Sequence, residues 1–161
     1  MPLYHLTMTR LREGSIIEPG NWGRLVRKYE NATLRNSQFG GNLAGWIIAR
    51  ELVLELERVK NFNGLPSRFD SSFSFRDAEN VERYRLKNDI HKAQVLHEIE
   101  FVEPAAVTHE ASVSLLDWPP PDHSFLTVMG NMAAEYWKGA VAGDVREVVS
   151  ASALRVLRSV E

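Results

Sequence analysis

The chain has 161 residues, of which 44% are hydrophobic, so it is long enough for one domain with a substantial core and short for two. Its 19 basic and 21 acidic residues give a formal net charge of −2, which excludes a strong overall attraction to nucleic acid or anionic lipid but not a local basic groove. Cysteine is absent, which excludes disulfides and thiolate metal sites, and no apolar run reaches the length of about 18 residues that suggests a membrane span.

The first part of the chain predicts two short strands and a long helix. Residues 3–7 (LYHLT) and 16–17, with turn signals between and after them, predict the strands. From Asn42, a plausible N-cap, apolar residues at helical spacing predict an amphipathic helix that ends near residue 63. We expect its core-facing positions to be Leu43, Ile47, Ile48, Leu52, Leu56 and Val59. The other side carries the charged residues Arg50, Glu51, Glu57 and Arg58.

The rest of the chain predicts strands mainly in neighbouring pairs. Residues 67–75 alternate Phe69, Phe73 and Phe75 with polar residues, which is typical of a strand with one buried face, and a short helix follows over 78–85. Two further strands are expected within 93–104 and 106–118, a helix over 125–137, and two adjoining strands over 144–159. This order of elements predicts an α+β fold, with helices packed on a mainly antiparallel sheet, in one domain spanning residues 1–161.

Glu147 stands at the beginning of the first terminal strand, and two interpretations of it are open. It is either an exposed carboxylate on an edge strand or a carboxylate held in a cleft. His5 has a similar alternative, since a histidine on an inward strand face is often just hydrogen-bonded to the backbone.

Three separated segments resemble, in order, the three motifs of ADP-ribosyltransferases of the diphtheria-toxin and poly(ADP-ribose) polymerase type. Residues 3–7 (LYHLT) resemble the first motif, an aromatic–His pair followed by a small polar residue. Residues 71–84 (SSFSFRDAENVERY) resemble the second, a strand leading into a helix, and 146–156 (REVVSASALRV) the third, a strand that begins with the catalytic glutamate. Segments such as HEIEFV and AEYWKG are also similar to small uncharacterised bacterial proteins of this superfamily. The resemblance implies an ADP-ribosyltransferase-like split, mainly antiparallel sheet.

By this resemblance the catalytic residues are Glu147 and His5, and NAD is the donor of ADP-ribose. Cleavage of the nicotinamide–ribose bond passes through an oxocarbenium-like centre, which a carboxylate such as Glu147 stabilises while it binds a ribose hydroxyl. His5 would donate a hydrogen bond to the other ribose, with Thr7 close by and the Leu6 backbone available to the nicotinamide amide. The charge of Glu147 is then the essential property, so Glu147→Gln is expected to stop transfer with little effect on stability.

The second motif departs from the family pattern, because Phe73 stands where the His-Tyr-Glu branch has a tyrosine that stacks on nicotinamide. Phe73 could still supply the stacking face. The alternative is that Ser72 or Ser74 acts as in the Arg-Ser-Glu branch, with Arg10 or Arg24 as the arginine.

Residues 18–24 (EPGNWGR) allow two interpretations of equal weight. They form either a plain turn or a loop in which Arg24 meets the pyrophosphate of NAD and Trp22 covers its adenine. The spacing of His91, His97, His109 and His123 fits no metal-ligand pattern, so no metal site is expected.

The resemblance implies a mono-ADP-ribosyltransferase acting on a macromolecule, which looks like the toxin of a bacterial toxin–antitoxin or phage-defence system. We expect it in the cytoplasm, away from membranes, with an antitoxin protein as a possible partner. The acceptor is RNA, DNA or protein; a nucleic-acid strand would use a groove with the basic residues Arg24, Arg27, Lys28, Arg35 and Arg68. The alternative function is a catalytically inactive module that binds a nucleotide or a partner, and an RNA 2′-phosphotransferase of the same fold is a third.

Overall fold

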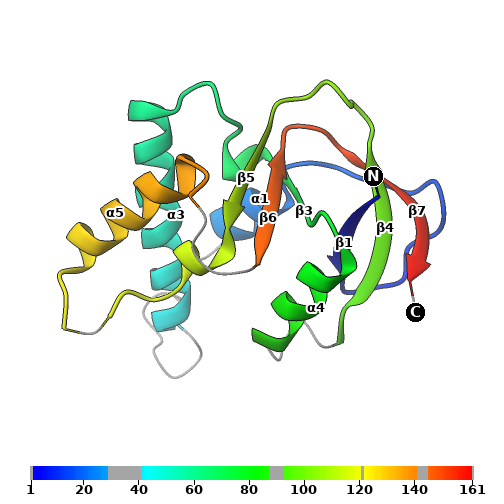
Figure 1. Ribbon diagram of the computed structural model, residues 1–161. Helices are drawn as coiled ribbons and strands as arrows, with labels where there is room; N and C mark the ends of the chain where they lie inside the picture. Colours follow the sequence, from blue (N-terminus) through cyan, green and yellow to red (C-terminus); the bar gives the residue numbers. More distant parts are fainter. Residues whose placement is uncertain (1, 29–40, 88–92, 121, 141–144, 161) are drawn as a thin grey trace.

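The computed structural model describes residues 2–28, 41–87, 93–120, 122–140 and 145–160, and Figure 1 shows how their elements are arranged. The helices are α1 (Asn21–Arg27), α3 (Gly41–Asn61), α4 (Ala78–Lys87) and α5 (Phe125–Trp137). The strands are β1 (Leu3–Thr7), β2 (Ile16–Ile17), β3 (Ser72–Ser74), β4 (Val95–Phe101), β5 (Thr108–Ser112), β6 (Arg146–Ser150) and β7 (Leu154–Val160). Two single turns of 3-10 helix, Arg68–Asp70 and Val113–Leu116, complete the described elements.

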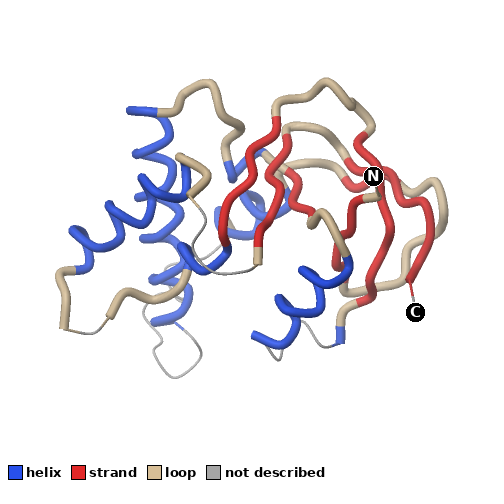
Figure 2. Tube along the Cα trace, viewed as in Figure 1, coloured by secondary structure: helices blue, strands red, loops and turns tan. Residues whose placement is uncertain are grey.

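The strands form two antiparallel sheets that meet along β1 and β3. One sheet has the order β1-β4-β7-β2 and the other the order β3-β6-β5. A single bridge joins them: Tyr4 and Phe75 exchange two backbone hydrogen bonds of 2.9 Å each. Figure 2 shows the two groups of strands, with α3 and α5 beside the β3-β6-β5 sheet and α4 near β1. The expected α+β class with mainly antiparallel sheet is therefore confirmed.

Helices α3 and α5 pack against each other and against the β3-β6-β5 sheet. Their shared core contains Leu54, Ala133, Tyr136, Trp137 and Val149, all nearly inaccessible to solvent. The indole N–H of Trp137 donates a hydrogen bond of 2.7 Å to the Leu54 carbonyl, so the one polar group of this large buried side chain has a partner.

The expected orientation of α3 is wrong at most of its positions. Leu52 and Leu56 are 51% and 70% exposed, and Leu43 and Val59 are also exposed, whereas Glu51 is only 1% exposed. Helix α3 carries two stripes that could face a core, and the one that does runs through Ala44, Glu51 and Leu54. The charge of Glu51 is tolerated there because cationic partners reach it, as the site geometry below shows.

Three other expectations on local structure need correction. Phe69 lies in a 3-10 turn instead of the strand, which is shortened to Ser72–Ser74. The strand expected within 106–118 ends at Ser112 and continues as a 3-10 turn. Residues 18–24 form neither a plain turn nor a loop, because helix α1 begins at Asn21.

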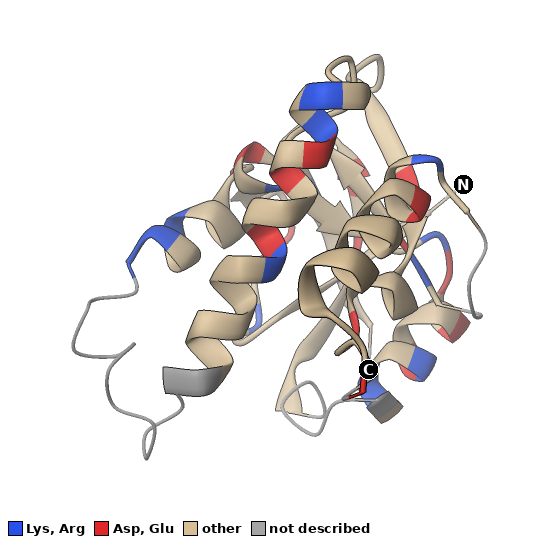
Figure 3. Cartoon of the chain, turned by 90° about the vertical axis from the view of Figure 1, so that its left-hand side faces the viewer, with Lys and Arg blue, Asp and Glu red and all other residues tan. Residues whose placement is uncertain are grey.

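Helix α1 is fixed by two glycines. Gly20 precedes it with a φ of 81°, a conformation that favours glycine. Gly23 lies so close to the chain at Phe69 that a Cβ there would meet the Phe69 carbonyl oxygen at 1.9 Å. The two glycines that suggest a turn in the sequence therefore permit the start of a short helix and its close packing on the chain at Phe69. Figure 3 shows this helix with its basic residues at one side of the molecule.

Candidate functional site

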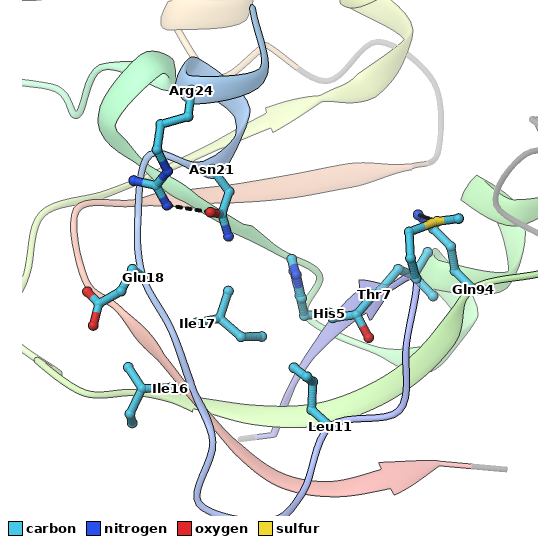
Figure 4. A pocket seen from close by; sticks show the side chains of 11 residues that line it. His5, Thr7, Leu11, Ile16, Ile17, Glu18, Asn21, Arg24 and Gln94 are labelled. Atoms are coloured by element: carbon cyan, nitrogen blue, oxygen red, sulfur yellow. Dashed lines mark hydrogen bonds between the residues drawn. The ribbon is translucent and has the colours of Figure 1, made fainter. Parts of the chain in front are cut away.

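An open pocket of about 520 Å³ lies between strand β1, the chain leading to β2, and helix α1 (Figure 4). Its polar and charged lining residues are His5, Thr7, Glu18, Asn21, Arg24 and Gln94. Its apolar lining residues are Leu6, Met8, Leu11, Ile16 and Ile17. The volume is within the usual range of small-molecule sites, and the mixture of apolar walls with a few polar groups is typical of them.

His5 is oriented in this pocket by the strand beside it. Its Nδ1 lies 2.6 Å from the carbonyl oxygen of Phe73. A carbonyl only accepts, so Nδ1 carries the hydrogen and donates it. Burial lowers the pKa of His5 below its ordinary value against the opposing effect of that carbonyl, and the neighbouring His97 lowers it further. In the neutral ring Nε2 is then an acceptor, which differs from the expectation that His5 donates a hydrogen bond to a ribose.

A second histidine, His97, holds the wall of the pocket behind His5. It lies opposite His5 in the β1–β4 pair and is fully buried. Its Nε2 accepts a 3.0 Å hydrogen bond from the backbone N–H of Leu11, while its Nδ1 lies 3.2 Å from the Val95 carbonyl. Burial lowers the pKa of His97, which keeps the ring neutral and able to accept from Leu11. The chain that follows β1 is thereby fastened to the sheet.

Helix α1 brings Arg24 to the pocket but not Trp22. The Arg24 guanidinium donates to the Pro19 carbonyl at 3.1 Å and to the side chain of Asn21, and the residue remains exposed. Trp22 is half-buried, does not line the pocket, and its indole N–H is buried without a partner among the described residues. Arg24 is thus available to an anionic ligand, whereas nothing places Trp22 beside one.

The residues of the second motif lie beside the pocket and do not line it. Ser72 donates a 2.8 Å hydrogen bond to the Ser152 carbonyl, and Ser74 is completely buried. The Phe73 ring is covered on one face by the guanidinium of Arg68, 4.9 Å from the ring centroid. Its backbone carbonyl, and not its ring, is the part of Phe73 that meets His5.

Glu147 lies on β6, which is the central strand of its sheet, so the edge-strand interpretation is wrong. The residue is 8% exposed. Its Oε1 accepts a hydrogen bond from Arg68 Nη1, with which it forms an ion pair, and another of 2.8 Å from the Tyr136 hydroxyl. Glu147 shares its sheet face with Val149 and Phe73, which pack toward α3 and α5. It is not among the residues that line the His5 pocket.

The Glu147 carboxylate belongs to a buried charged network of Arg50, Glu51, Arg68, Tyr136 and Glu147. Arg68 Nε donates to Glu51 Oε2 at 2.9 Å, and Arg50 Nη2 donates to Glu51 Oε1 at 2.8 Å. The two arginines and two glutamates balance in charge, which is the condition for burying them at tolerable cost.

The shifts of pKa within this network follow from the same contacts. Burial alone would lower the pKa of Arg68, but the carboxylates of Glu147 and Glu51 outweigh it and raise that pKa. Burial would raise the pKa of Glu51, and the charges of Arg68 and Arg50 lower it instead. Burial, with Glu147 beside the phenol, raises the pKa of Tyr136, which therefore stays protonated and donates.

The sequence interpretation missed Arg68, Glu51 and Tyr136 as parts of a site. Arg68 is 5% exposed, so the expectation that it lines a nucleic-acid groove is wrong. Of the other basic residues expected in that groove, Arg24, Arg27 and Lys28 are exposed, and Arg35 lies outside the described residues. The helical spacing of α3 could have indicated that Glu51 is buried, because Glu51 lies three residues before Leu54 on the same side of the helix.

The fold and the two sites define a class: an α+β protein with a divided antiparallel sheet, an open pocket beside the division and a buried charged network next to it. The chain belongs to the DUF2441 family, described as a protein of unknown function, which matches residues 44–161. The match includes Arg68, Phe73 and Glu147, and it begins after β1 and α1, which carry the His5 pocket. No curated protein matches the chain.

Two further observations concern the described part of the chain. None of its helices is long and apolar enough to cross a membrane. Among the same residues, no group of three or more histidine, aspartate or glutamate side chains is arranged to hold a metal ion.

Proposed function

We propose that this chain is an ADP-ribosyltransferase that moves ADP-ribose from NAD to a macromolecular acceptor and acts as the toxin of a toxin–antitoxin or phage-defence system. The observation that carries the proposal is the pocket beside β1. Four of the residues expected to bind NAD line it together: His5, Leu6, Thr7 and Arg24.

The order of the strands supports the same proposal. The strands of the three motifs are β1, β3 and β6; β3 pairs with β6, and β3 meets β1 at the Tyr4–Phe75 bridge. The resemblance implies that these strands converge where the sheet splits. β1 therefore comes close to β3 at this bridge, and β6 is the next strand beyond β3.

Each reactive group then has a defined part in the transfer. The bond between C1′ of the ribose and the nicotinamide nitrogen breaks, and its electron pair leaves with nicotinamide. The acceptor nucleophile forms the new bond to C1′ and releases its proton to solvent. His5 Nε2 accepts a hydrogen bond from a ribose hydroxyl, Arg24 faces the pyrophosphate, and the Glu147 carboxylate stabilises the positive charge that develops on the sugar.

The second candidate function is a catalytically inactive module that binds a nucleotide or a partner. One observation favours it: Glu147 is held by Arg68 and Tyr136 in the network and is not part of the pocket lining. A pocket with His5 and Arg24 but without the Glu147 carboxylate would bind a nucleotide and leave it intact.

The deciding experiment measures nicotinamide release and NAD binding with the same purified protein. NAD labelled in the nicotinamide ring is incubated with and without cellular RNA, DNA and protein, and calorimetry gives the affinity. Release that depends on an acceptor, with ADP-ribose found on that acceptor by mass spectrometry, supports the transferase. Binding without release supports the module, and absence of both refutes the transferase and a module that binds NAD.

A matched pair of variants tests whether the pocket is the NAD site. Arg24→Met removes a charge from the pocket, and Arg83→Met removes one from α4, where the Arg83 side chain is 42% exposed, pairs with Glu79 and does not line the pocket. We expect the first variant to weaken NAD binding roughly tenfold, in keeping with the loss of a charge-assisted hydrogen bond, and the second to leave it unchanged. Equal effects of the two changes would contradict the assignment of the pocket.

A further inference from the structure

The two oxygens of the Glu147 carboxylate are in different situations. Oε1 accepts both hydrogen bonds that the network provides, from Arg68 Nη1 and from the Tyr136 hydroxyl. No described residue donates a hydrogen bond to Oε2. A completely buried oxygen without a donor would be an unsatisfied buried atom, and Oε2 is not one, so it is not completely buried. The side chain keeps 10% of its surface exposed. Oε2 is therefore the oxygen that remains open to a ligand.

The group that holds Oε1 is itself immobilised. Glu51 fixes the Nε side of the Arg68 guanidinium at 2.9 Å, and Arg50, which anchors Glu51, is bound in turn to the Leu116 carbonyl at 3.1 Å. The rings of Phe73 and Tyr136 lie 4.9 and 5.2 Å from the same guanidinium. The carboxylate on the other side of Arg68 consequently has one fixed direction.

Stability is a weak explanation for this arrangement. The surrounding core of α3 and α5 is apolar, with Leu54, Ala133 and Val149 among its members. Replacing a buried ion pair by apolar side chains of similar volume is often neutral or stabilising, so charges kept in such a core are better explained by a need for a carboxylate in a fixed position.

We propose that Arg68 and Tyr136 are positioning residues for Glu147: by holding Oε1 they direct Oε2 at the nicotinamide ribose during transfer. This inference rests on the proposed transferase function. Glu147 remains a carboxylate throughout, since the electron pair of the broken bond leaves with nicotinamide and the acceptor releases its proton. A carboxylate that is already oriented needs no reorganisation when the sugar becomes positive, and that is the source of its effect on the rate.

The test is Tyr136→Phe, which deletes one donor to Oε1 and keeps the buried ring. Its control is Trp137→Phe, which deletes the hydrogen-bond donor of a buried aromatic side chain on the same helix; that donor binds the Leu54 carbonyl at 2.7 Å and not Glu147. Initial rates of nicotinamide release give kcat and KM per folded molecule, and thermal melts run alongside. We expect Tyr136→Phe to lower kcat at least about tenfold with KM unchanged, and Trp137→Phe to leave both unchanged per folded molecule.

The outcomes separate the inference from the function on which it rests. A wild-type protein that releases no nicotinamide refutes the transferase and the inference with it. An active wild type whose kcat survives in Tyr136→Phe, or falls equally in Trp137→Phe, refutes the inference alone. A purely structural role for Tyr136 would lower the melting temperature and leave kcat per folded molecule intact.

Substitution of Arg68 gives a second measurement of the same role. Arg68→Lys retains the charge and Arg68→Met removes it, so a positioning role predicts partial recovery of kcat in the lysine variant relative to the methionine variant. Equal activity of the folded lysine and methionine variants would count against the inference. Should neither variant fold, the comparison of Tyr136→Phe with Trp137→Phe still decides it.

Discussion

Glu147→Gln should destabilise the protein as well as remove activity, contrary to what the sequence suggests. The substitution keeps the shape of the side chain but deletes one anion from a network of two cations and two anions. Arg68, which is 5% exposed, and Arg50 would then share the single carboxylate of Glu51, so one positive charge of the network would be left without compensation.

The size of the effect follows from the burial of the pair. Removing one partner of a buried ion pair typically costs about 3–5 kcal/mol. The amide oxygen of glutamine still accepts from Arg68 or Tyr136, which favours the lower end, about 3 kcal/mol. For a chain of this size a loss of 1 kcal/mol lowers the melting temperature by about 2–4 °C, so the expected decrease is about 6–12 °C.

Urea unfolding and thermal melts of matched variants measure this effect. Glu100→Gln is the control, because Glu100 pairs with Arg155 at 2.7 Å but both side chains are 46% exposed. The free energy of unfolding should change by less than about 1 kcal/mol in that variant. A change within about 0.5 kcal/mol for Glu147→Gln, or equal changes in the two, would refute the buried ion pair. Activity must accordingly be compared per folded molecule.

Two further predictions concern the pocket and its supports. Because burial lowers the pKa of His5 and His97 in the folded chain, the unfolded chain binds protons more readily, and the free energy of unfolding should decrease as the pH falls below about 6.5. Urea unfolding across this pH range tests it, and an identical pH dependence in His97→Gln would contradict the assignment to His97. Gly23→Ala should cost at least about 2 kcal/mol, since its Cβ would lie 1.9 Å from the Phe69 carbonyl oxygen, whereas Gly45→Ala, with no atom within 4 Å in α3, should stabilise by about 0.5–1 kcal/mol. Thermal melts compare the two, and a Gly23→Ala variant as stable as the wild type would refute the close packing of α1.

The sequence predicts the elements that have a regular pattern and fails where two patterns compete. Helix α5 and the pair β6 and β7 follow directly from periodicity. Helix α3 does not, because its exposed leucines form a stripe as regular as the buried one, and only tertiary contacts decide which stripe faces the core. Helix α1 was hidden because Gly20 and Gly23 signal a turn, although here they permit a helix start and a close contact.

The His5 pocket and the charged network differ in how far the sequence could indicate them. His5, Leu6 and Thr7 are adjacent in the chain, so a single sequence motif contains three of the residues that line the pocket. The network draws two charges from α3, one from the 3-10 turn before β3 and one from β6, each unremarkable in its own segment. With 19 basic residues in the chain, a carboxylate on a central strand has many possible counter-ions. Only the topology, which places Arg68 between Glu51 and Glu147, selects one of them, and that selection turns a charge expected at the surface into a fixed part of the core.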